Sequence, residues 1–180
     1  EEEDLISEYS EDEINGINII DASDKFIAPG LIDVHVHFRD PGYSFKEDII
    51  TGSKAAAKGG FTTVVLMANT CPVVDNKETL DYVLEKGKET LINIESCCSI
   101  TKGLKGKELV NMQELIDVGA IGFTDDGIPI LDESIVIEAM KQSALLNVPL
   151  SFHEENPQLI AENGINHGKA SEYFGILGSP

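Results

Sequence analysis

Five short runs rich in β-forming residues recur along the chain at intervals of about 29 residues. They begin near residues 31, 61, 92, 120 and 148 and read LIDVHVHF, FTTVVLMAN, INIESCCSI, AIGFTDD and VPLSFHE. The segments between them have helical patterns: SFKEDIITGSKAAAKGG, DNKETLDYVLEKG, KELVNMQELIDVG and DESIVIEAMKQSALLN. Regular alternation of strand and helix predicts βαβ units around a parallel sheet, which fits either a doubly wound sheet or a (β/α)8 barrel.

The helical patterns also predict particular ends and faces. Asp75 and Glu78 have the spacing of a capping box and so indicate where the second helix begins. After the fifth strand we expect a short helix over NPQLIAENG and then a glycine-rich loop. The fourth helical pattern carries apolar residues on one face, namely Val136, Ile137, Met140 and Ala144.

Length and composition limit the class of protein. An eight-unit barrel typically needs about 250 residues, so 180 residues with five units predict an incomplete barrel. The net charge of −19, from 13 basic and 32 acidic residues, disfavours nucleic-acid binding. No run approaches the roughly 20 apolar residues of a membrane span, and three cysteines without a disulfide framework suit the cytoplasm. Eight acids and no base in residues 1–13 indicate a solvated lead-in.

The first strand combines an apolar face with a nitrogen-rich one. His35, His37 and Arg39 alternate with Val34, Val36 and Phe38. Successive side chains of a strand point to opposite sides, so the two imidazoles and the guanidinium share one side.

Polar residues also end three other strands. By the same alternation, Asn69, Asp126 and His153 fall on the presumed inner face of the second, fourth and fifth strands. In parallel α/β folds the carboxyl ends of the strands form the active site. Imidazoles and a carboxylate gathered there are suitable ligands for zinc. Ordinary structural roles remain open, because NTCP is turn-like and one aspartate of the Asp-Asp-Gly sequence fits a cap.

Several longer motifs together resemble the amidohydrolase superfamily, and within it the bacterial class I dihydroorotases. They are PGLIDVHVHFRDPG, GSKAAAKGGFTTVVLMANTCPVVD, GFTDDG and FHEEN, in family order over about 29–180. The resemblance implies that 29–180 is the N-terminal part of a metal-dependent TIM barrel. It also implies that 1–28 combines the acidic lead-in with the remnant of a small β-sandwich domain.

The resemblance assigns roles to six positions. His35 and His37 would bind a first zinc ion, Asp126 would bridge to a second, and His153 would bind that second ion, so one or two Zn2+ are expected. His37, Arg39 and Asn69 would contact the substrate. The general acid/base aspartate is expected beyond Pro180, and so the fragment alone is expected to be inactive. Ala68 replaces the proline that the family usually has there.

The implied reaction interconverts N-carbamoyl-L-aspartate and dihydroorotate, a cytoplasmic step of pyrimidine synthesis. Two alternatives stay open: a related allantoinase or hydantoinase, against which Arg39 counts, and a non-catalytic subunit that scaffolds aspartate transcarbamoylase. A homodimer and an aspartate transcarbamoylase partner are left open as well. Nucleic-acid and membrane partners are not expected.

Overall fold

Five parallel strands form a single curled sheet in the computed structural model, which describes residues 20–158, 160 and 164–179. The strands are β1 (Leu31–Val36), β2 (Phe61–Leu66), β3 (Asn93–Cys98), β4 (Gly122–Thr124) and β5 (Leu150–Ser151). Their spatial order is β1-β2-β3-β4-β5, with every neighbouring pair parallel. A doubly wound sheet reverses its strand order at a switch point, whereas a barrel adds strands in sequence. The observed order therefore confirms the barrel prediction.

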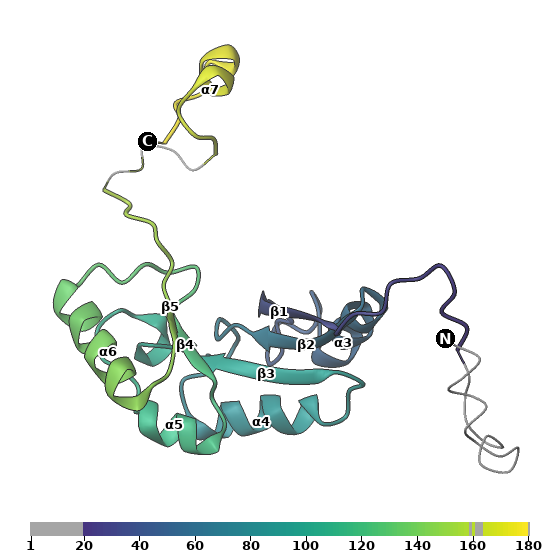
Figure 1. Cartoon of the computed structure of the whole chain (residues 1–180). Coiled ribbons are helices and arrows are strands. Elements are labelled where there is room, and N and C mark those ends of the chain that lie inside the picture. Colours follow the sequence, from purple (N-terminus) through teal and green to yellow (C-terminus); the bar gives the residue numbers. More distant parts are fainter. Residues whose placement is uncertain (1–19, 159, 161–163, 180) are drawn as a thin grey trace, which may run out of the picture.

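Helices follow the strands as the sequence pattern predicts. They are α3 (Ile49–Lys58), α4 (Lys77–Gly87), α5 (Met112–Val118) and α6 (Glu133–Leu146), with a 3-10 turn, η1 (Lys102–Leu104), before α5 and a short α7 (Lys169–Phe174) near the end of the chain. In Figure 1, α4, α5 and α6 follow one side of the curled sheet. Among the described helices, none combines the length and the apolar character that a bilayer crossing requires.

The sheet separates two apolar clusters. The larger lies between the sheet and the helices, where Val64 and Phe123 of the strands meet Leu80 and Leu115 of the helices. On the opposite side, Val65, Met67 and Cys97 form a smaller cluster. The period-2 pattern of β2 thus directs alternate residues into two environments. The smaller cluster lies on the side that the polar strand ends share.

Short side chains at the helix starts satisfy free backbone N–H groups. Asp48 caps α3 by accepting from the Thr51 N–H, and Asn76 caps α4 by accepting from the Thr79 N–H. The predicted capping box starting at Asp75 is therefore wrong by one residue. The Asp75 carboxylate instead accepts from the Gly103 backbone N–H at 2.8 Å, a contact between distant parts of the chain.

The apolar face predicted on α6 is largely open to solvent. Ile137 and Met140 are 44% and 56% exposed, while Ala139 is fully buried in the main core. Packing rather than periodicity therefore selects the buried face of α6.

The two ends of the chain are described only in part. The acidic segment 1–13 lies outside the described residues, and 20–30 contain neither helix nor strand, so the β-sandwich remnant stays a prediction. Within NPQLIAENG the described residues contain no helix. The following segment, predicted as a loop, holds α7 over Lys169–Phe174.

Candidate metal centre

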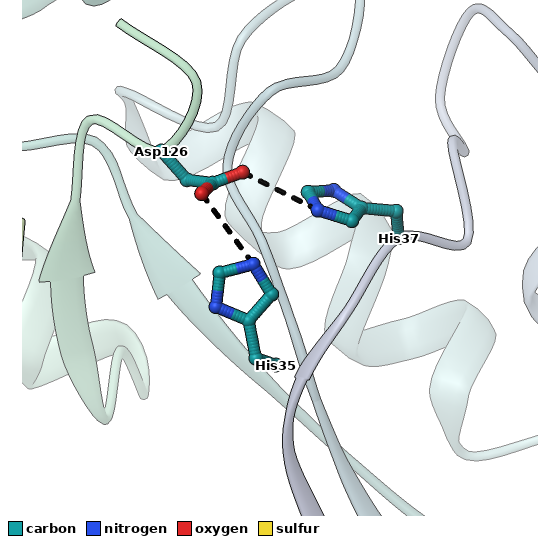
Figure 2. A group of neighbouring side chains, drawn as sticks. All are labelled: His35, His37 and Asp126. Atoms are coloured by element: carbon teal, nitrogen blue, oxygen red, sulfur yellow. Dashed lines mark ion pairs between the residues drawn. The ribbon is translucent and has the colours of Figure 1, made fainter. Parts of the chain in front are cut away.

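Three of the predicted ligands meet at the carboxyl ends of β1 and β4. His35 Nε2 lies 3.4 Å from Asp126 Oδ1, and His37 Nε2 lies 3.3 Å from Asp126 Oδ2. Figure 2 shows the two imidazoles pointing at the same carboxylate, His35 from β1 and His37 from the segment directly after it. One ligand atom from each residue fits within a group 4.8 Å across. The alternation argument thus placed both histidines correctly, and the fold brings in Asp126 from 89 residues beyond His37.

Asn69 connects three members of this group. Its Oδ1 lies 2.9 Å from His37 Nδ1 and 3.4 Å from Arg39 Nη1, and its Nδ2 donates to Asp126 Oδ2 at 3.2 Å. Arginine can only donate and a carboxylate can only accept, which fixes the orientation of the amide. His37 Nδ1 therefore carries the proton and donates to Asn69. The Nε2 lone pair of His37 is left facing Asp126, as ligation requires.

The neutral form of His37 is favoured by its surroundings. Burial lowers the pKa of His37, and the nearby Arg39 guanidinium acts in the same direction, while the Asn69 hydrogen bond and the Asp126 carboxylate oppose them. A metal takes neutral imidazole, so a lowered pKa keeps His37 in its ligating form at neutral pH.

His153 lies at the edge of the same group. Its Nδ1 is 3.9 Å from Asp126 Oδ1, whereas its Nε2 is 2.8 Å from Glu155 Oε2. A histidine ligand usually donates its second ring nitrogen to a carboxylate, and Glu155 offers this contact. The sequence analysis missed Glu155, and strand alternation could not have identified it, because β5 ends at Ser151 and the Glu155 N–H donates to the His153 carbonyl in a tight turn.

Adjacent aspartates have different environments. Asp125 is 1% exposed and accepts from the backbone N–H groups of Ile100 and Thr101 and from the Thr101 hydroxyl. Burial raises the pKa of Asp125, with these hydrogen bonds opposing it. Asp125 therefore connects the end of β4 to the segment after β3, and of the two aspartates it is Asp126 that faces the histidines.

The donor set fits a divalent zinc ion. Two imidazole nitrogens and a carboxylate oxygen converge, with a third imidazole beside them, and zinc prefers nitrogen and carboxylate ligands of this kind. His35, His37 and Asp126 would hold the ion, and His153 would complete the set. Arg39 contributes a fixed positive charge next to it.

Comparisons with known proteins agree on one family. A family model described as "Dihydro-orotase-like" matches residues 24–180. The dihydroorotase of Clostridioides difficile is 55% identical over 161 residues, covering 89% of this chain and 38% of that protein. The dihydroorotase of Streptococcus pneumoniae is 47% identical over 175 residues, covering 97% of this chain and 41% of that protein. The chain thus spans about two fifths of the length of these curated relatives.

A solved structure supports the fold. L-Hydantoinase (dihydropyrimidinase) from Arthrobacter aurescens superimposes with a TM-score of 0.61 at 24% sequence identity, covering 78% of this chain and 32% of that chain. This similarity confirms the predicted fold class, the N-terminal part of a (β/α)8 barrel.

Proposed function

Since the chain belongs to the dihydroorotase-like family, we propose that its protein is a zinc-dependent cyclic amidohydrolase that interconverts N-carbamoyl-L-aspartate and (S)-dihydroorotate. We assign the reaction to the pyrimidine (UMP) pathway in the cytoplasm, a compartment that the three free cysteines support. One observation carries the proposal: Asn69 joins a metal-ligating group and the Arg39 cation in one hydrogen-bonded site.

Arg39 suits the anionic part of this substrate. Dihydroorotate carries a carboxylate beside its cyclic amide, and a guanidinium can bind a carboxylate with two parallel hydrogen bonds. Arg39 lies two residues after His37, so its guanidinium would hold the ring next to the metal ligands. Holding the ring there converts an encounter of separate molecules into a positioned reaction. A hydantoin or allantoin ring has no carboxylate at this place, and Arg39 therefore favours dihydroorotate.

The remaining site residues keep the centre in its working form. Asn69 orients His37 with Nε2 toward Asp126, and Asp126 holds both imidazoles within reach of one ion. When zinc is bound, it supplies a Lewis acid that polarises the amide carbonyl and lowers the pKa of water toward neutrality. The presence of all these ligands counts against a non-catalytic scaffold subunit.

The direct test measures ring opening of dihydroorotate by the full-length protein, with and without a zinc chelator, and with hydantoin as the competing substrate. We expect turnover of dihydroorotate that the chelator abolishes and added zinc restores. Folded, zinc-loaded protein without turnover would instead support the scaffold function, and preference for hydantoin would support a related cyclic amidase.

A pair of variants tests the metal ligands. His35→Ala should abolish activity and lower the amount of bound zinc, because it removes one ligand of the group. His167→Ala is the matched control: this histidine is exposed and lies outside the group of metal-ligating residues. Equal zinc content and turnover in the two variants would contradict the metal assignment.

A further inference from the structure

The loop that carries Arg39 is fastened to helix α4 by one buried carboxylate. Asp40 is 3% exposed, and its Oδ2 accepts a hydrogen bond from Lys86 Nζ at 2.6 Å. Its Oδ1 accepts from the Tyr82 hydroxyl at 3.0 Å. The Ile49 backbone N–H, at the start of α3, donates weakly to Oδ2 at 3.4 Å. Three residues from two helices, α3 and α4, therefore hold this one side chain.

Lys86 lies on a helix that is packed firmly in the core. It lies in the last turn of α4, whose Leu80 and Val83 are 0% and 1% exposed in the main core. The hydrogen bond to Asp40 raises the pKa of Lys86, so the ammonium stays charged at neutral pH. A buried ion pair contributes little net stability compared with an apolar contact of the same size. Its main effect is to hold the two side chains in one relative position.

That geometry is transmitted to Arg39 through one peptide unit. Arg39 has φ +57°, a left-handed conformation that costs free energy for a residue with a side chain. The Tyr43 N–H donates to the Arg39 carbonyl at 2.9 Å and closes the loop beyond it. Asp40 points into the protein while the Arg39 guanidinium reaches Asn69, so fixing one side chain fixes the backbone from which the other departs.

We propose that Asp40 and Lys86 are positioning residues that hold Arg39 in place for the substrate carboxylate. This inference rests on the proposed function, in which Arg39 binds that group. Neither residue touches the substrate; both act through the Arg39 backbone. Loss of the pair would weaken carboxylate binding in the ground state and transition state alike, which raises KM and leaves kcat nearly unchanged.

The test compares Lys86→Met with Lys88→Met in the full-length, zinc-loaded protein. Both lysines lie at the end of α4, but Lys88 pairs with Glu85 in a solvent-exposed contact. Lys86→Met should raise KM for dihydroorotate about tenfold or more with kcat within about twofold. Lys88→Met should leave both constants unchanged, and Lys86→Arg should restore much of the lost affinity.

A double-mutant cycle separates positioning from general damage. If Lys86 acts through Arg39, then Lys86→Met has no further effect on KM once Arg39→Ala is present. The same increase in KM in both backgrounds would overturn the inference, as would an unchanged KM in Lys86→Met alone. Asp40→Asn, which keeps the shape of the side chain and removes its charge, should reproduce the Lys86→Met result.

A second readout is independent of catalysis. Hydrogen exchange of the backbone amides of 39–47 should be faster in Lys86→Met than in wild type, and unchanged in Lys88→Met. If the wild-type protein shows no turnover, the proposed function is contradicted. Hydrogen exchange would still test whether the Asp40–Lys86 pair holds the loop in place. Equal exchange in the two variants would overturn the anchoring role.

Discussion

Asp125 and Asp126 are neighbours in the chain, but their replacement should affect different properties: stability for Asp125 and zinc binding for Asp126. We expect Asp125→Ala to lower the free energy of unfolding and to leave bound zinc unchanged. Asp126→Ala should release zinc and change the stability of the zinc-free protein little. The reason is that the two side chains point in different directions just after β4: Asp125 accepts from the buried Ile100 N–H, and Asp126 lies beside His35.

The magnitude follows from the donors that Asp125 satisfies. Its Oδ1 accepts from the Ile100 N–H at 2.7 Å and the Thr101 N–H at 3.0 Å, and its Oδ2 accepts from the Thr101 hydroxyl. Ile100 and Thr101 are both 0% exposed, so water cannot replace the carboxylate. Each buried donor left unpaired costs about 1–3 kcal/mol, so Asp125→Ala should lose at least about 3 kcal/mol.

Asparagine at position 125 should be much milder. Its Oδ1 keeps both backbone contacts, and only the hydroxyl of Thr101 loses its acceptor, a loss of about 1 kcal/mol. Burial raises the pKa of Asp125, so an uncharged side chain suits this environment.

The assay is urea unfolding of the full-length protein followed by far-UV circular dichroism. It is run with a chelator present, because bound zinc would itself add stability. Zinc per chain is measured separately by elemental analysis of the metal-loaded variants. Loss of zinc without loss of stability in Asp125→Ala would refute the reasoning, as would equal destabilisation by Asp125→Ala and Asp125→Asn.

Three further predictions use other parts of the structure. Gly42→Ala should lower the free energy of unfolding in urea by about 2–4 kcal/mol, because the added Cβ would lie 1.9 Å from the Cys71 carbonyl oxygen at a backbone φ of +89°. Gly60→Ala is the control: its φ is +87° but no atom lies nearby, so the loss should be only about 1 kcal/mol. Maleimide at pH 7 should label the exposed Cys71 and spare Cys97, because burial raises the pKa of the Cys97 thiol to about 11. Labelling of Cys97 in the folded protein, detected by peptide mapping, would contradict its buried position. Because the pKa of Asp125 is raised in the native state, its contribution to stability is complete below the unfolded pKa and is lost as pH rises through the native pKa; this slope should be absent in Asp125→Asn when unfolding is measured across mildly acidic pH.

Local patterns predicted much of the candidate site. The period of 2 along β1 placed His35, His37 and Arg39 on one side, and the same rule placed Asp126 apart from Asp125. The histidine and aspartate predictions succeeded because side chains alternate along extended backbone, whereas Arg39, at φ +57° beyond the end of β1, reaches Asn69 from a left-handed conformation. The roles in catalysis and substrate binding stay predictions that the experiments above address.

Other features depended on contacts between distant segments. Alternation could not show that Asn69 would orient His37, since that hydrogen bond spans 32 residues. The start of α4 moved by one residue because Asp75 bonds to Gly103 instead of capping the helix. The apolar stripe of α6 is largely exposed because burial is decided by what packs on a helix, and Ala139 enters the main core instead.

The sequence by itself therefore determined the order of strands and helices and the two-sided character of the β1 segment, since each follows from local periodicity and turn chemistry. The tertiary structure alone decided that the sheet has the strand order of a barrel, which face of α6 is buried, and that Lys86 reaches Asp40 across 46 residues. The physical reason is that side-chain direction is a local property of the backbone, whereas distances between remote side chains depend on how the whole sheet curls and how the helices pack against it.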